Sequence, residues 1–261
     1  MRVSVSIVMP VLNEASRIVS AVRRLSRDFG DCELIVVDGG SSDGTRQLLE
    51  EMLDGAASTE LRVVTSHPGR ARQMNTGARH AHGDVLWFIH ADTAIDPNAL
   101  PELQRVLADP QVVGGGLTLR FDRTSIALRY LAWTSNIRAR RLHWIFGDQA
   151  LFVRRTAFYA VGGFPELPIM EDLDLSRRLA RLGDLAVLTA ASTASTRQFD
   201  EHGTWPMLVF MQWLKLLHFC GVDPARIARR YAAGPPRPLR SRSPKSPQLL
   251  DRKESIGVHS G

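Results

Sequence analysis

The chain has 261 residues, of which 44% are hydrophobic, and a formal net charge of +6. A chain of this length can bury a full core as one large α/β domain or as two small domains at most. Residues 229–261 hold eight Lys or Arg and two acids, so they carry the whole net charge and leave residues 1–228 formally neutral. The excess of basic residues therefore belongs to a tail and does not indicate a nucleic-acid-binding surface, so we expect no nucleic acid partner.

The sequence also limits the cellular setting. The two cysteines, Cys32 and Cys220, provide neither a disulfide framework nor a zinc-binding pattern, which is typical of a reducing cytoplasm. No run approaches the roughly 20 apolar residues of a membrane span. The first ten residues predict a strand rather than a signal peptide, because their apolar stretch is too short. We therefore expect a cytoplasmic protein.

The first half of the chain alternates predicted strands and helices. Short apolar runs predict strands at 3–9, 33–37, 61–65 and 85–89, and helical spacing or start signals predict helices at 15–27, 45–53, 70–81 and 98–108. Repeated β-α units of this size predict an α/β fold with a mostly parallel sheet and helices on both faces.

The second half of the chain is less regular. We predict strands at 111–120 and 149–153, helices at 125–141 and 171–182, and an apolar helix at 205–219. From residue 234 onward Pro, Arg and Ser dominate, and such a segment cannot bury enough apolar surface to fold. The expected organisation is one domain over 1–233, including the apolar helix 205–220, followed by a basic, disordered tail over 234–261.

Two acidic loops, each directly after an apolar run, are the most informative feature. Asp38, Gly40 and Asp43 lie in the loop that follows 33–37, and Asp92 lies in the loop that follows 85–89. In open α/β sheets, ligands bind where the carboxyl ends of strands meet the loops. Carboxylates at that edge suit a nucleotide with a divalent metal on its diphosphate. The alternatives are a plain tight turn at 38–45, with Asp43 capping the next helix, and a strand-end cap at Asp92.

Two further segments can face a nucleotide. Pro10, Asn13 and Glu14 end the first strand, where the polar side chains either face a ligand or cap the next helix. Arg70 and Gln73 lie at the start of a predicted helix, where free backbone amides and an Arg make an anion site. A solvated basic helix face explains this second segment equally well.

The second half contributes candidates for the reaction itself. Glu171 and Asp172 start a predicted helix, where acids are favoured in any case, or serve as a carboxylate base. Asp148 and Gln149 form a polar island in apolar surroundings. His202 lies in another such island, although a lone His is more often structural than a ligand.

Taken together, these motifs resemble the family 2 glycosyltransferases of the GT-A fold. The motifs occur in the order P-x-x-N-E at 10–14, V-V-D-G-G-S-S-D-G-T at 36–45, R-x-x-Q-x-N-x-G at 70–77, H-A-D at 90–92, G-G-F at 162–164 and E-D at 171–172. The resemblance covers residues 3–190. The runs at 69–75, 146–149 and 168–172 resemble, more narrowly, short bacterial members labelled radical-SAM/selenodomain-associated or arsenosugar-biosynthesis glycosyltransferases.

The resemblance implies a role for each motif. Asp172, with Glu171 beside it, would be the base that deprotonates an acceptor hydroxyl, which then attacks the anomeric carbon with inversion. Asp148 and Gln149 would lie on the acceptor side. The implied nucleotide-binding residues are Pro10, Asn13, Glu14, Asp38, Gly40, Asp43, Arg70, Gln73 and Asp92.

The resemblance also implies a metal. Asp92 would bind Mg²⁺ or Mn²⁺ that bridges the diphosphate of a nucleotide-sugar donor, with UDP as the expected nucleotide. The family's usual first acid of D-x-D is here His90, so the loop has one carboxylate, and His202 is a candidate for a later ligand.

Two other functions use the same motifs. A nucleotidyltransferase of this fold usually carries a Gly-rich loop with Lys or Arg after the first strand, and 10–14 is not such a loop. A non-catalytic nucleotide-sugar-binding protein would not need Asp92, Glu171 and Asp172 together. The acceptor is expected to be a small molecule or a lipid-linked compound. The helix 205–220 with the basic tail suits contact with the inner face of a membrane, or packing on the domain or on a second subunit.

Overall fold

The computed structural model describes residues 3–54, 61–197, 199 and 203–235, and in this part of the chain eight strands form one sheet. The strands are β1 (Val5–Val11), β2 (Glu33–Asp38), β3 (Leu61–Thr65), β4 (Val85–Phe88), β5 (Ala94–Ile95), β6 (Val112–Phe121), β7 (Phe152–Arg154) and β8 (Asp184–Ala194). Their order across the sheet is β3-β2-β1-β4-β7-β6-β8-β5.

The sheet is mostly parallel, as the repeated β-α units predict. Strands β3, β2, β1 and β4 are parallel neighbours, and β6 is parallel to β8. Strand β7 is antiparallel to both β4 and β6, and β5 is antiparallel to β8. The carboxyl ends of β1, β2 and β4 therefore lie at one edge, where the loops with Glu14, Asp38 and Asp92 begin.

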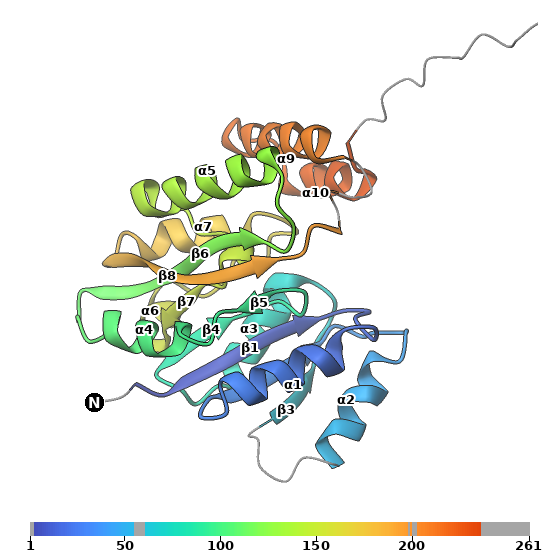
Figure 1. The fold of residues 1–261 in the computed structure, drawn as a ribbon, viewed down its shortest axis with the longest axis vertical. Coiled ribbons are helices and arrows are strands. Elements are labelled where there is room, and N and C mark those ends of the chain that lie inside the picture. The colour runs from blue at the N-terminus through green and yellow to red at the C-terminus, as the bar shows by residue number, and fades with distance from the viewer. Residues whose placement is uncertain (1–2, 55–60, 198, 200–202, 236–261) are drawn as a thin grey trace, which may run out of the picture.

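Helices cover both faces of the sheet, which confirms the predicted architecture (Figure 1). Alternate residues of a strand point to opposite faces. Ile7 and Met9 of β1 pack with α1, whereas Val8 packs with Met74 of α3. The helices are α1 (Ile18–Asp28), α2 (Thr45–Asp54) and α4 (Ala99–Val106) on one face, and α3 (Arg70–His80), α6 (Arg155–Ala160) and α7 (Glu171–Leu179) on the other.

Three further helices form a layer of their own. They are α5 (Ile126–Leu142), α9 (Thr204–Phe219) and α10 (Pro224–Ala233), which lie together at one end of the molecule (Figure 1). Buried Leu128, Phe210, Leu214 and Ile227 join them in one apolar cluster. Among the residues that the structure describes, every helix is too short or too polar to cross a lipid bilayer.

The predicted strand at 149–153 is partly wrong. Residues Gly147–Gln149 form a 3-10 turn, here called η1, and the strand begins only at Phe152. Ala150 has φ of 46°, which is incompatible with an extended strand, and Gln149 turns its amide inward to Leu117 O. The helix predicted at 171–182 ends at Leu179. The division at residue 233 stays a prediction, and the tail from 236 onward lies outside the described residues.

Candidate active site

A cavity of about 560 Å³ lies between the carboxyl edge of the sheet and the layer of α5, α9 and α10. The loops after β1 and β4, the start of α7 and the turn η1 all contribute to its wall. Eight of the residues singled out from the sequence line it: Pro10, Glu14, Arg70, His90, Asp92, Asp148, Glu171 and Asp172.

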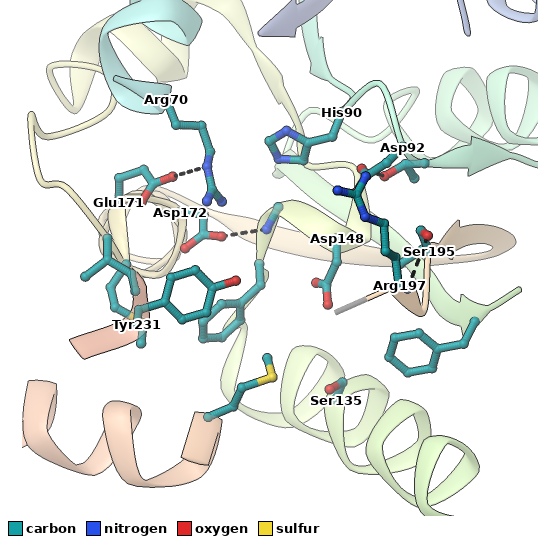
Figure 2. Close-up of a pocket in the computed structure, with 18 of the residues that line it drawn as sticks. Arg70, His90, Asp92, Ser135, Asp148, Glu171, Asp172, Ser195, Arg197 and Tyr231 are labelled. Atoms are coloured by element: carbon teal, nitrogen blue, oxygen red, sulfur yellow. Dashed lines mark hydrogen bonds and ion pairs between the residues drawn. The ribbon is translucent and has the colours of Figure 1, made fainter. Parts of the chain in front are cut away.

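Asp172 is held in one orientation by backbone donors. Its Oδ2 accepts a hydrogen bond from the Gly147 N–H at 2.6 Å, and its Oδ1 accepts one from the Leu173 N–H at 2.7 Å. Helix α7 begins at Glu171, directly after Met170 with φ of 66°, so the carboxylate sits at the positive end of the helix dipole. Each carboxylate oxygen keeps a second lone pair, so Asp172 can still accept a proton from a group in the cavity (Figure 2).

Glu171 differs from Asp172 in its surroundings. The Glu171 side chain is almost fully buried, and its Oε1 lies 3.4 Å from Nε of Arg70. Burial, together with the neighbouring charge of Asp172, raises the pKa of Glu171 to about 7. Both acids line the cavity, but their chemistry differs: Glu171 is paired with Arg70 and has a raised pKa, whereas backbone N–H groups hold the Asp172 carboxylate in place.

His90 stands where the family pattern has an acid. Burial and the nearby charge of Arg70 lower the pKa of His90 to about 4, so its imidazole is neutral at pH 7. The ring lies against η1: a Cβ atom on Gly147 would come within 2.6 Å of His90 Nε2 and within 3.4 Å of Asp172 Oδ2. Gly147 thus permits both side chains to approach, a role that the sequence pattern alone did not reveal.

The donor set tests whether a divalent metal fits. In the described part of the chain, no group of three or more His, Cys, Asp or Glu side chains could hold a metal ion. Mg²⁺ is usually bound through one or two carboxylates together with substrate phosphates and water, and does not need an all-protein cage. Asp92 lines the cavity and supplies one such carboxylate, so the residues fit a metal that is shared with a diphosphate. His202 lies outside the described residues.

The loops after β1 and β2 are tied to each other. Asp38 accepts hydrogen bonds within its own loop, from the N–H groups of Gly40 at 3.3 Å and Ser41 at 3.1 Å. Asn13 Oδ1 accepts from the Ser42 N–H at 2.9 Å. These contacts shape the rim next to Pro10 and Glu14, and direct contact of Asp38, Gly40 and Asn13 with a nucleotide stays a prediction.

The side chains of Asp43, Gln73 and Gln149 form hydrogen bonds with other groups of the protein. Asp43 accepts a hydrogen bond from the Thr45 N–H at 3.1 Å and so caps α2, which is the structural alternative to a ligand-binding role. Gln73 Nε2 donates to the carbonyls of Val11 at 2.7 Å and Val37 at 2.9 Å, at the ends of two parallel strands. None of the three side chains lies among those that line the cavity, and their ligand-binding roles stay predictions.

The part of the cavity next to α5 and α9 combines Asp148, which the sequence singled out, with two basic side chains to which the sequence assigned no role in a site. Asp148 in η1 has a raised pKa because it is buried, and its Oδ1 has no hydrogen-bond partner among the described residues. Arg138 of α5 and Lys215 of α9 line the same part. Lys215 is the one charged residue in an apolar helix, which was a usable signal, whereas Arg138 resembles its solvated neighbours in the run 138–141.

Sequence comparisons relate the chain to known glycosyltransferases. The model of glycosyl transferase family 2 matches residues 6–164. A glycosyltransferase, AglE, of Haloferax volcanii is 27% identical over 172 residues, which is 62% of this chain and 56% of the relative. An undecaprenyl-phosphate 4-deoxy-4-formamido-L-arabinose transferase of Pseudomonas fluorescens is 33% identical over 134 residues, which is 48% of this chain and 38% of the relative. The chain thus matches about half, or less, of the length of these curated relatives.

A solved structure shares the fold. It is the mannosyltransferase PcManGT of Pyrobaculum calidifontis, in complex with GDP-Man and Mn²⁺. The TM-score is 0.67 at 21% sequence identity, over 85% of this chain and 65% of that one. This neighbour confirms the expected α/β, GT-A architecture.

Proposed function

The chain belongs to glycosyl transferase family 2, and on this premise we propose that it transfers a sugar from a nucleotide-sugar donor to an acceptor hydroxyl. One observation carries the proposal. Asp92, in the loop after β4, and Asp172, at the start of α7, line one cavity although 80 positions separate them in the sequence. A donor-side acid and an oriented base in one cavity are the two elements that glycosyl transfer requires.

In the proposed reaction, Asp172 accepts the proton of the acceptor hydroxyl. The hydroxyl oxygen forms a bond to the anomeric carbon as the bond from that carbon to the diphosphate oxygen breaks. The nucleoside diphosphate leaves with the electron pair, and attack from the opposite face inverts the configuration. The backbone N–H groups of Gly147 and Leu173 keep the Asp172 carboxylate in one orientation throughout.

Charge on the departing diphosphate requires compensation. Asp92 is the residue that would hold Mg²⁺ or Mn²⁺, which would act as a Lewis acid on the diphosphate oxygens. Arg17, Arg70 and Arg197 also line the cavity and add positive charge on the donor side. Neutral His90 beside Arg70 adds no charge of its own at pH 7.

The finer assignments form part of the same proposal. We expect a UDP-sugar as donor, and an acceptor that is a small molecule or lipid-linked compound. We also propose membership of the short bacterial subgroup labelled radical-SAM/selenodomain-associated or arsenosugar-biosynthesis glycosyltransferases, and a cytoplasmic location. The motifs at 69–75, 146–149 and 168–172 support the subgroup.

A thermal-shift titration tests the donor. UDP, GDP, CDP, ADP and dTDP would be titrated separately, each with and without Mg²⁺ or Mn²⁺. A ligand that binds only the folded state stabilises it by about 2.7 kcal/mol at 100 times its Kd. A metal-enhanced shift with one diphosphate is expected and identifies the nucleotide. No shift with any of them would contradict a nucleotide-sugar donor.

Two other results would indicate the alternative functions. Donor binding without hydrolysis or transfer would indicate a non-catalytic protein. Release of pyrophosphate from a nucleoside triphosphate and a sugar phosphate would indicate a nucleotidyltransferase.

We further propose that the layer of α5 and α9 contacts an anionic membrane surface. Each helix carries a stripe of exposed apolar side chains at intervals of three or four residues, which places each stripe on one helix face. These side chains expose 38–84% of their surface: Ile126, Tyr130, Trp133 and Ile137 on α5, and Trp205, Val209, Trp213 and Leu216 on α9.

Positive charge borders these stripes. Arg230 of α10 lies 5.0 Å from the ring centroid of Trp213, and Arg129 and Arg141 are exposed on α5. Aromatic side chains with flanking Arg suit the interface of an anionic bilayer better than a neutral protein partner. The basic tail, which the sequence also assigns to this contact, lies outside the described residues.

Flotation with vesicles tests the contact. Vesicles of phosphatidylcholine with and without phosphatidylglycerol would be mixed with the full chain, a chain truncated after Tyr231, and Trp133→Ser. Leu53→Ser, on the distant α2, is the control because Leu53 is also exposed. The full chain is expected to float with anionic vesicles, and Trp133→Ser to float less. Equal, negligible flotation of all forms would reject membrane contact.

A further inference from the structure

Two cations converge on one aromatic ring in the part of the cavity next to α5 and α9. The guanidinium carbon of Arg138, from α5, lies 4.2 Å from the ring centroid of Phe146, and Lys215 Nζ, from α9, lies 5.1 Å from the same centroid. Both residues line the cavity, as do Phe146 and Asp148. Helices far apart in the sequence thus bring two positive charges to the same wall.

Neither cation is neutralised by a direct contact. Among the described residues, the ion pairs include neither Arg138 nor Lys215, and Asp148 and Asp172 attract both cations without a direct contact. The Nε–H of Arg138 donates only a long hydrogen bond, 3.4 Å, to Trp144 O. Buried charges are normally paired, because an unpaired charge away from water is costly. Burial, reinforced by the charge of Arg138, lowers the pKa of Lys215 to about 8.

A purely structural role accounts poorly for this arrangement. If Arg138 and Lys215 served only as counter-ions for Asp148, its carboxylate would be expected to contact them. Instead Asp148 Oδ1 is buried without a hydrogen-bond partner in the described part of the chain. Three polar groups with unused hydrogen-bonding capacity thus face the same space, as in a site built for a polar ligand.

Both cations act on the acid that we propose as the base. Asp172 interacts electrostatically with Arg138 and Lys215, and also with Arg70. Asp92 acts on Arg70 but is not among the charges that act on Arg138 or Lys215. The pair is therefore placed to meet the acceptor, whose hydroxyl must reach Asp172, rather than the diphosphate of the donor.

We propose that the acceptor carries a phosphate monoester, which binds between Arg138 and Lys215 while an acceptor hydroxyl faces Asp172. This inference rests on the proposed glycosyl transfer. A phosphate monoester carries close to two negative charges at neutral pH, which matches two cations, and Arg and Lys are the side chains that commonly bind phosphate. Asp148 Oδ1 accepts a hydrogen bond from a further acceptor hydroxyl.

The phosphate can belong to a soluble molecule or to a lipid headgroup, and the experiment separates them. Glycerol 3-phosphate, with glycerol as its uncharged control, is the soluble probe, measured by calorimetry. Phosphatidylcholine vesicles with or without phosphatidic acid are the lipid probe, measured by flotation. Both probes would be applied to the full chain and to Arg138→Gln and Lys215→Gln. Arg23→Gln is the control, because Arg23 is an exposed basic residue of α1 that lines neither the cavity nor the layer of α5, α9 and α10.

At least one phosphate probe is expected to bind, at least about tenfold more weakly to Arg138→Gln and Lys215→Gln than to wild type and Arg23→Gln. The arm in which this difference appears identifies the source of the phosphate. Equal binding by all four proteins, or no phosphate-dependent binding in either arm, would overturn the inference.

Two measurements keep the outcome interpretable. Arg138→Lys and Lys215→Arg retain the charge and are expected to recover binding, so a loss in the Gln variants cannot be ascribed to misfolding. Nucleoside diphosphate binding would be measured on the same variants and is expected to be unchanged. If wild type binds a nucleoside diphosphate but neither phosphate probe, the inference about the acceptor fails alone. If nucleoside diphosphate binding is absent from wild type, the proposed function fails as well.

Discussion

Replacement of Asp172 by Asn tests the assignment of the base. The change removes the proton acceptor, and general base catalysis contributes about 10²–10⁴-fold, or roughly 2.7–5.5 kcal/mol of activation free energy. The structure adds a second cost. Because both carboxylate oxygens accept backbone N–H groups, from Gly147 and Leu173, the Asn amide must leave one of these donors without an acceptor. That unpaired donor lowers the free energy of unfolding by about 1–3 kcal/mol.

The assay follows release of nucleoside diphosphate from the nucleotide sugar that the thermal-shift titration identifies. Asp172→Asn is expected to lower kcat by about 10²–10⁴-fold and to leave the Kd of the nucleoside diphosphate nearly unchanged. Asp174→Asn is the control: Asp174 lies on the same helix, pairs with Arg178 at 2.6 Å and does not line the cavity. The control is expected to keep near-wild-type turnover. Wild-type kcat in a folded Asp172→Asn protein would refute the assignment.

Three further substitutions probe the surrounding structure. In the folded protein the pKa of Glu171 is raised from its ordinary 4.5 to about 7. The wild type should therefore lose stability relative to Glu171→Gln as pH rises from 4.5 to 7. A difference in melting temperature between the two proteins that does not vary with pH would contradict this. Gly147→Ala introduces a Cβ 2.6 Å from His90 Nε2. It should lower kcat on the order of 10²-fold, because small displacements of reacting groups are costly. An unchanged kcat would show that η1 accommodates the Cβ without displacing these groups. Asp43→Ala removes the cap of α2 and should lower the free energy of unfolding, measured by chemical denaturation, by about 0.5–2 kcal/mol. A raised KM for the donor in the same variant would show that Asp43 also contacts the nucleotide.

Much of the fold follows from local patterns in the sequence. The strands β1 to β4 and the helices between them form where short apolar runs and helical spacing predict them. These patterns depend on residues a few positions apart, so they can be recognised without the fold. The convergence of the loops at one edge follows as well, because the carboxyl ends of parallel strands lie together. For this reason Glu14 and Asp92 were expected near one another, and both line the cavity.

The second half of the chain was less predictable. Strand β8 and helix α10 were not predicted. The burial of β8 does not follow a simple alternation, because its register with β6 shifts between Leu117 and Thr118. The segment around Gln149 contains enough apolar residues for a strand, but its side-chain hydrogen bond to Leu117 O and the positive φ of Ala150 favour a turn.

By itself, the sequence determined the α/β architecture, the family resemblance and the acids at the strand and helix ends, because these depend on short-range periodicity and on motif order. Only the tertiary structure decided which of these side chains face the cavity. It turned Gln73 and Gln149 inward to satisfy strand carbonyls, and it brought Arg138 and Lys215 to one ring of Phe146. Contacts between residues so distant in the chain arise from helix packing, which no local pattern encodes.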